Sequence, residues 1–255
     1  MIELRNLHYS YGDEPLLRDV NLKIEEGERI VLLGVNGSGK STLLKIVNGL
    51  LFPKKGEYIY SGEKVEEKRF KDRAFRERFR KEVVLLFQNP EVMLFNATVY
   101  DEMAFSLRQL RLKEEEIRQR VLFWAEQFDL ISLLKKPPFE LSLGQKQKLC
   151  LASLLVLQPR VLLLDEPTAH LDPKSVGWLV DLLWELSCTT VVSTHNLSLA
   201  SELGDRLIVL GEDHCVLYDG EVNAFVRNRE MLIKAGLMHT HKRRGGEDYH
   251  IHYFW

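Results

Sequence analysis

The chain has 255 residues, 45% of them apolar, which allows one large domain or two small ones with a sizeable buried core. Lysine and arginine total 35 against 37 acidic residues, so the net charge of -2 gives no global electrostatic case for nucleic acid as the main partner. The three cysteines, Cys150, Cys188 and Cys215, are widely spaced, which argues against a disulfide framework or a structural metal and favours a reducing compartment.

The start of the chain lacks the basic and then apolar layout of a signal peptide. No apolar run approaches the roughly 20 residues that a spanning helix needs. We therefore expect any contact with a membrane to run through partners.

The N-terminal third predicts antiparallel strands and then a strand that enters a glycine-rich turn. Short alternating stretches separated by polar turns fill residues 2–30 and are typical of antiparallel strands. The apolar run 30–33 leads straight into the turn and a helical segment from residue 41, as expected of a buried strand that feeds a helix. Another edge strand is expected at 56–62. The charge-dense stretch 63–82 predicts a solvated helix with one packed face, in preference to a nucleic-acid contact.

The remainder of the chain alternates strand-like and helix-like segments. Short apolar runs predict buried strands at 83–87, 161–164, 189–193 and 207–210. Apolar residues at helical spacing continue as far as Leu134, and a further helix is expected from Ser142, placed as its cap, to Leu157. This alternation predicts an α/β fold with a mostly parallel sheet covered on both faces.

Residues 34–41, Gly-Val-Asn-Gly-Ser-Gly-Lys-Ser, fit the phosphate-loop pattern G-x-x-x-x-G-K-[ST] at every fixed position. The glycines let successive N–H groups face one anionic centre, toward which the following helix turns its positive end. Lys40 then reaches the outer phosphates and the Ser41 hydroxyl ligates Mg²⁺. Because the pattern follows an apolar run and opens a helix, it predicts nucleotide binding in preference to a plain glycine-rich turn, but it does not by itself separate kinases, GTPases and transport ATPases. The expected nucleotide contacts are Gly34, Asn36, Gly37, Ser38, Gly39, Lys40, Ser41 and Thr42.

Asp165 and Glu166 directly follow a buried apolar run. They stand where the C-terminal edge of a parallel sheet meets a bound ligand. Asp165 suits Mg²⁺ coordination, directly or through water, and Glu166 is the candidate to polarise an attacking water. The alternative is that both are solvated acids at the end of a strand.

Further motifs follow in the order of the ATP-binding-cassette (ABC) family, which the chain resembles over nearly its whole length. Tyr9-Ser10-Tyr11 resembles the aromatic loop, so Tyr11 would stack on adenine. Gln88 matches the glutamine that reaches toward Mg²⁺ and the attacking water. Asp165-Glu166-Pro167-Thr168 resembles the second Walker motif, and Ser193-Thr194-His195 resembles the switch histidine that contacts the γ-phosphate. The resemblance implies an ATPase with Mg²⁺ as cofactor.

Leu141-Ser142-Leu143-Gly144-Gln145 resembles the family signature LSGGQ, and Asp172 lies in the subunit-junction loop. In the family Ser142, Gly144 and Gln145 would hold the γ-phosphate of ATP on the opposite subunit, within a head-to-tail pair that closes over two ATP molecules. Leu143 stands where the signature has glycine, and His170 where a small residue is usual. Leu cannot adopt backbone regions open only to glycine, and its bulk would obstruct close approach to the partner's phosphate. We therefore expect a heterodimer with unequal sites, with a homodimer as the alternative.

The resemblance implies a P-loop NTPase (RecA-like) α/β core, an N-terminal antiparallel β layer and an inserted helical subdomain at about 89–157. We expect a nucleotide-binding domain over 1–232 and a tail over 233–255 that docks on a partner. Competing interpretations are a non-transport ABC ATPase and a mainly regulatory nucleotide-binding subunit. The absence of long coiled coils and tandem cassettes disfavours the former.

Residues 88–91, 94–95 and 98–105 resemble the segment typical of energy-coupling-factor importers, which take up vitamins and cobalt or nickel ions. This implies a transmembrane coupling subunit, a substrate-binding membrane subunit and a second ABC ATPase as partners, no nucleic acid, and a peripheral place on the cytoplasmic face of the cell membrane. Val92, Met93, Leu94 and Phe95 would line a groove for the coupling subunit, or else fill the core of the helical subdomain.

The C-terminal tail contains His239, His241, His250 and His252 and ends in three aromatic residues. Paired histidines two residues apart suit metal binding from an extended strand. We expect instead a mobile or docking segment whose aromatic end packs on a partner.

Overall fold

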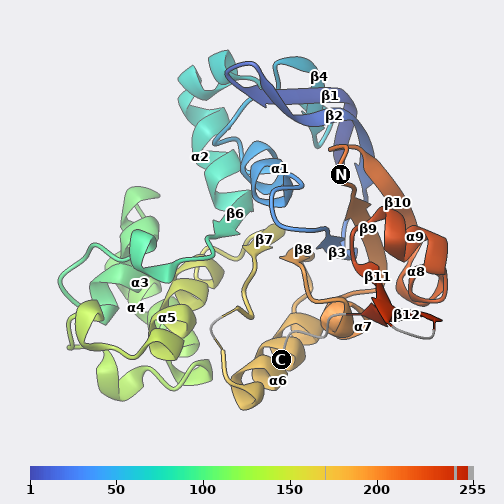
Figure 1. The fold of residues 1–255 in the computed structure, drawn as a ribbon. Coiled ribbons are helices and arrows are strands. Elements are labelled where there is room, and N and C mark those ends of the chain that lie inside the picture. Colours follow the sequence, from blue (N-terminus) through green and yellow to red (C-terminus); the bar gives the residue numbers. More distant parts are fainter. Residues whose placement is uncertain (170, 244–245, 252–255) are drawn as a thin grey trace.

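The computed structural model describes residues 1–169, 171–243 and 246–251. Its centre is a six-stranded sheet in the order β10-β9-β3-β8-β7-β6, parallel from β9 to β6, with β10 antiparallel at one edge (Figure 1). Its strands are β3 Arg29–Leu33, β6 Val83–Leu86, β7 Val161–Asp165, β8 Thr189–Thr194, β9 Arg206–Leu210 and β10 Val216–Glu221. The mostly parallel sheet predicted from the apolar runs is confirmed.

A second, antiparallel sheet covers one face of the molecule. Its order is β2-β1-β4-β5, and its strands are β1 Ile2–Tyr11, β2 Glu14–Ile24, β4 Lys55–Tyr60 and β5 Glu63–Lys64. Helix α1, Lys40–Val47, lies between the two sheets (Figure 1). Successive residues of β3 point to opposite faces, so Ile30 and Leu32 pack on the α1 side while Val31 and Leu33 face the helices beyond.

The insertion between β6 and β7 is helical and forms a lobe beside the sheet (Figure 1). It consists of α3 Val99–Gln109, α4 Glu114–Gln127 and α5 Leu143–Leu155, with short 3-10 turns. Thr98 caps α3 by accepting from the Asp101 amide. Further helices are α6 Pro173–Glu185, α7 Ala200–Leu203, α8 Val222–Val226 and α9 Arg229–Lys234. No described helix combines the length and apolar character needed to span a bilayer.

The expectation of one helix over residues 63–82 is wrong in its first half. The stretch starts as β5, continues through a 3-10 turn at Glu67–Lys71, and becomes helical only in α2, Arg73–Glu82. The break lies at Asp72, whose carboxylate accepts hydrogen bonds from the amides of Ala74 (2.9 Å) and Phe75 (3.4 Å). A capping aspartate favours a helix that starts immediately after it.

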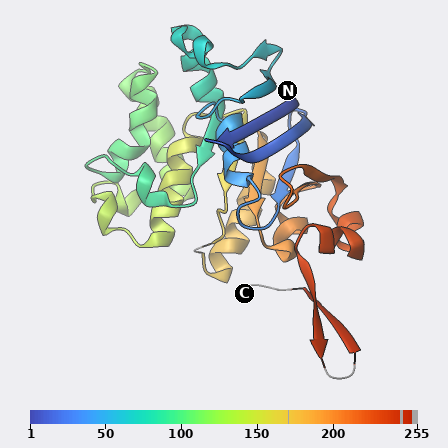
Figure 2. The ribbon, with the colours of Figure 1, turned by 45° about the horizontal axis from the view of Figure 1, so that its top comes forward.

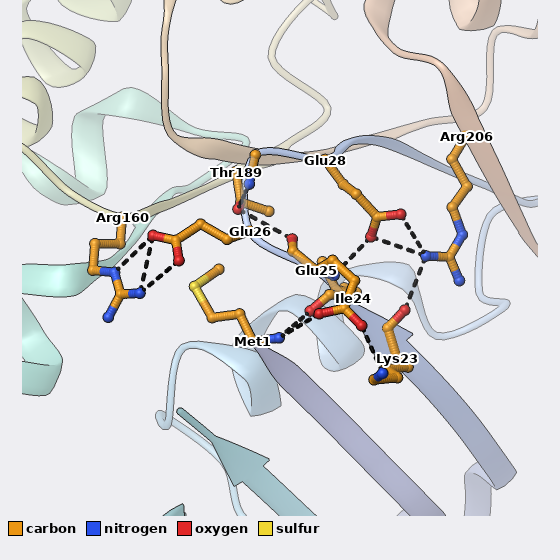
Figure 3. A network of polar contacts seen from close by, with 10 residues as sticks. Met1, Lys23, Ile24, Glu25, Glu26, Glu28, Arg160, Thr189 and Arg206 are labelled. Carbon is orange, nitrogen blue, oxygen red and sulfur yellow. Dashed lines mark hydrogen bonds and ion pairs between the residues drawn. The ribbon is translucent and has the colours of Figure 1, made fainter. Parts of the chain in front are cut away.

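The turn that leads into β3 is fixed by polar contacts with residues in β8 and β9 and with Arg160, which directly precedes β7 (Figure 3). Arg206, at the start of β9, donates to the Glu28 carboxylate at 3.0 and 3.1 Å and to the Lys23 carbonyl at 2.9 Å. Arg160, beside β7, donates two 2.9 Å hydrogen bonds to Glu26, and the Thr189 hydroxyl accepts from the Gly27 amide at 2.8 Å. These bonds fix where β3 starts, and therefore where it delivers the loop that follows it.

Beyond α9 the chain forms a hairpin of β11 Met238–Arg243 and β12 Gly246–Ile251, which projects from the body (Figure 2). In its register His239 lies opposite His250 and His241 opposite Asp248. The tail was expected to be a mobile or docking segment; the structure gives it two strands, and docking on a partner stays a prediction. His252 and the aromatic end, residues 253–255, lie outside the described residues.

Candidate active site

The glycine-rich loop between β3 and α1 is curled by its glycines. Gly37 and Gly39 have φ angles of 84° and 107°, which strain any residue with a side chain. A Cβ atom on Gly39 would lie 2.7 Å from the Leu16 carbonyl oxygen, and one on Gly34 would lie 2.7 Å from the Leu210 carbonyl oxygen. At both positions a side chain would collide with the neighbouring backbone. The loop therefore requires glycine for close packing as well as for its backbone conformation.

The side chain of Lys40, the first residue of α1, is buried among oxygen atoms. Its ammonium donates to the carbonyls of Gly34 (2.7 Å) and Val35 (3.2 Å) and lies 3.6 Å from Glu166 Oε1. Burial lowers the pKa of Lys40, and the nearby charges of Glu166 and Asp165 oppose that effect. The result is a positive charge held in place at the base of the loop.

The carboxylates at the end of β7 are held from the neighbouring strand β8. The Ser193 hydroxyl donates to Asp165 Oδ1 (2.7 Å) and accepts from the Glu166 amide (2.9 Å). Glu166 has a φ angle of 47°, which is uncommon for a residue other than glycine and turns its side chain toward Lys40. Glu166 Oε2 lies 3.0 Å from Nδ1 of His195, which follows β8. Glutamate, lysine and histidine from three elements therefore converge.

A cavity of about 320 Å³ opens where these groups meet. Its lining residues are Leu16, Asn36, Gly37, Gly39, Lys40, Ser41, Thr42, Gln88, Glu166 and His195. The structure thus brings together most of the predicted nucleotide contacts and all three predicted catalytic residues. Asp165 is buried directly beside Glu166 and is not in the lining.

Three other predicted residues lie outside this lining. Gly34 and Ser38 belong to the loop, but both are buried and do not border the cavity. Tyr11, at the end of β1, is 51% exposed, and its ring makes an edge-to-face contact with Tyr9 at 5.1 Å. Sequence reasoning missed Leu16, which reaches the cavity from β2; an isolated leucine in a strand carries no signal of that role.

The predicted signature and junction residues line a second cavity, of about 310 Å³, that shares no lining residue with the first. Ser142, Gly144, Gln145 and Asp172 all border it. Ser142 caps α5 through a reciprocal pair: its hydroxyl accepts from the Gln145 amide (3.3 Å), and Gln145 Oε1 accepts from the Ser142 amide (3.0 Å). The two motif sets therefore form separate sites on one chain.

The prediction that leucine at position 143 strains the backbone is wrong. Leu143 is the first residue of α5, its φ is not positive, and 42% of the residue is exposed. A helical position accepts leucine without strain. The substitution therefore changes the surface beside Ser142 and Gly144, and not the path of the chain. His170, the other departure, lies outside the described residues.

A sequence profile described as ABC transporter matches residues 17–169, which span the phosphate loop, the signature and the paired carboxylates. The chain belongs to the ABC transporter family. It is an ATPase of this family, and its fold is the ABC ATPase fold expected from the motifs.

Curated ABC relatives match over nearly the whole chain. An ABC transporter ATP-binding protein of Methanosarcina acetivorans is 42% identical over 97% of this chain and 92% of its own length. A nickel import ATP-binding protein, NikO, of Rhodobacter capsulatus is 40% identical over 96% of both chains. An energy-coupling factor transporter ATP-binding protein, EcfA, of Methanothermobacter thermautotrophicus is 37% identical over 93% of this chain and 76% of its own length.

Solved ABC structures share the fold. CbiO1 from Clostridium perfringens, described as part of the ABC transporter complex cbiONQ, superimposes with a TM-score of 0.78 at 33% identity, covering 92% of this chain and 94% of that one. The ATP-binding cassette MJ0796, solved as a dimer bound to ADP and Pi, superimposes with a TM-score of 0.76 at 30% identity, covering 87% of this chain and 99% of that one. The chain is thus an ABC ATPase subunit of a transporter, with energy-coupling-factor ATPases among its relatives.

Proposed function

We propose that this chain is the ATP-hydrolysing subunit of an energy-coupling-factor importer for a micronutrient such as a vitamin, cobalt or nickel. It would work as a nucleotide-sandwich dimer on the cytoplasmic face of the membrane. One observation supports this most: the phosphate loop with Glu166 and the signature with Asp172 line two separate cavities. A chain with two half-sites needs a second ATPase subunit to complete each one, in a head-to-tail pair.

In the first cavity each predicted residue has a chemical task. The loop amides and Lys40 bind the phosphates, whose negative charge the Lys40 ammonium offsets. Glu166 accepts the proton of the attacking water, and His195, 3.0 Å from Glu166, orients that carboxylate and approaches the γ-phosphate. Tyr11, exposed at the end of β1, stacks on adenine from outside the cavity.

The residues present fit a magnesium ion. Ser41, Gln88 and Asp165 offer hydroxyl, amide and carboxylate oxygens, the donors that Mg²⁺ prefers, and Asp165 is already oriented by Ser193 at 2.7 Å. When bound, Mg²⁺ neutralises charge that develops on the β- and γ-phosphate oxygens. The protein's part is to present these oxygens beside Lys40.

The dimer we propose is a heterodimer. Leu143 is 42% exposed and lies in the chain between Ser142 and Gly144, which border the second cavity. In the proposed dimer its isobutyl group would therefore stand close to the partner's γ-phosphate. A partner whose signature has the usual glycine would complete the ATP site formed by this chain's phosphate loop. The other site, formed by the partner's phosphate loop and this chain's signature, would be weakened by Leu143. Nucleotide trapping in separately inactivated sites tests the asymmetry; equal hydrolysis at both sites contradicts it.

The coupling groove for the membrane subunit is a third cavity, of about 340 Å³, on the helical lobe. Phe95 (66% exposed) and Phe139 (76% exposed) border it, and it continues from the segment that follows Gln88. Of the four residues predicted to line it, Leu94 and Phe95 do so. Val92 is exposed but lies outside the lining, and Met93, also outside it, packs against the core of the lobe. Exposed aromatic side chains beside a hollow suit an apolar helix of a membrane partner. We further propose that the tail over 233–255 docks on a partner subunit.

Charged substitutions test the groove. Phe95→Glu and Phe139→Glu should reduce co-purification of the membrane subunit at least about tenfold and leave ATP affinity unchanged, because a buried carboxylate without a partner is costly. The matched control is Phe123→Glu on α4, where the phenylalanine is similarly exposed (55%) but lies away from the groove. If all three variants retain the membrane subunit equally, the groove is not the docking site.

A further inference from the structure

Gln147 is a buried polar residue that lies between the two nucleotide half-sites. It projects from the second turn of α5, is only 4% exposed, and donates a hydrogen bond from Nε2 to the Pro167 carbonyl at 3.1 Å. Pro167 directly follows Glu166. A buried amide that bonds the backbone next to the proposed catalytic carboxylate is placed to control where that carboxylate points.

The backbone around Glu166 needs such support. Its φ of 47° costs free energy that the surroundings must offset, and a residue held in this region persists only when neighbouring groups fix it. On the β8 side the Ser193 hydroxyl accepts from the Glu166 amide at 2.9 Å. On the α5 side the Gln147 amide holds the Pro167 carbonyl. The turn at Glu166 and Pro167 is therefore held by hydrogen bonds from two elements, β8 and α5.

Gln147 also borders the second cavity, together with Ser142, Gly144 and Gln145 of the same helix. Because α5 starts at the signature, this bond links the N-terminal turns of α5 to the residue that follows Glu166. We propose that Gln147 is a positioning residue for hydrolysis, fixing the Glu166 turn against the signature helix. This inference rests on the proposed function, in which Glu166 activates water and the signature holds the opposite nucleotide.

The test removes the donor while keeping the shape. Gln147→Met is unbranched and of similar length but has no N–H group. In the assembled complex purified from membranes, we expect kcat to fall about tenfold and KM for ATP to stay within about twofold, since misplacing a catalytic group by a fraction of an ångström costs rate and not binding. Ser153→Ala, which removes another buried polar atom of α5, is the control and should behave as wild type.

A second measurement separates positioning from general destabilisation. If Gln147 acts through Glu166, then Gln147→Met should change the residual single-turnover rate of a Glu166→Gln background less than about twofold. If Gln147→Met lowers the hydrolysis rate by the same factor in both backgrounds, or does not lower it in the wild-type background, the inference is overturned while the proposed function stays intact. Absence of ATP hydrolysis by the wild-type complex overturns both.

Discussion

Glu166→Gln is the substitution that most directly tests the chemistry of the first cavity. It preserves the shape of a side chain that lies 3.0 Å from His195 and 3.6 Å from the Lys40 ammonium, and removes only its charge and basicity. Loss of a positioned base lowers the rate by about 10²- to 10⁴-fold, so we expect kcat to fall by at least a hundredfold. MgATP should bind at least as tightly, because a negative charge facing the γ-phosphate is removed.

We expect the Glu166→Gln variant to fold, because the group left without its charged partner keeps other hydrogen bonds. Leaving a buried charge without a partner costs about 3–5 kcal/mol. Here Lys40 keeps hydrogen bonds to the Gly34 and Val35 carbonyls, so the free energy of unfolding should change by about 1 kcal/mol. The assay is phosphate release at saturating MgATP, with thermal unfolding measured in parallel and the exposed Glu185→Gln as a control. A Glu166→Gln variant that retains more than about a tenth of the wild-type rate refutes the role of Glu166.

Two further predictions concern stability and cysteine reactivity. Arg206→Met removes the hydrogen bonds of Arg206 to Glu28 and Lys23 before β3 (Figure 3), and those to Asp219 in β10, and should lower the free energy of unfolding by about 1–2 kcal/mol. The control Arg5→Met, which removes an exposed pair with Glu3, should leave the urea midpoint unchanged. Burial raises the pKa of the Cys150 thiol to about 12, so its reactive thiolate is scarce near pH 8. Alkylation followed by mass spectrometry should find the more exposed Cys215 modified first and Cys150 only as the pH rises; early labelling of Cys150 would contradict its burial.

Local sequence patterns predicted the sheet and the phosphate loop well, because both depend on short-range chemistry. The apolar runs that form β3, β6, β7, β8 and β9 are bounded by turn residues, so each strand is found within one or two residues. The glycines of the loop are needed for its backbone shape, and the sequence shows them directly. The cap at Ser142 was likewise predictable, because capping involves residues only three positions apart.

What the sequence did not predict depends on residues far apart in the chain. Leu16 reaches the first cavity across the packing of two sheets, and Gln147 meets Pro167 only when α5 lies against the end of β7. At Leu143 the motif misled, because a departure from glycine suggests strain, yet the backbone there is an ordinary first helical turn. Motif order therefore predicted most of the residues that line each cavity, and only the fold showed that Gln147 joins α5 to the residue that follows Glu166.

The central claim is that the cavity formed by the phosphate loop, Glu166 and His195 is the ATP site, and calorimetric titration of MgATP into the Glu166→Gln chain tests it most directly. The account predicts one nucleotide bound per chain, and at least about a tenfold loss of affinity when Lys40→Met is added, because the ammonium that faces the phosphates is then absent. Binding that is absent in the first variant, or unaffected by the second, would contradict the account.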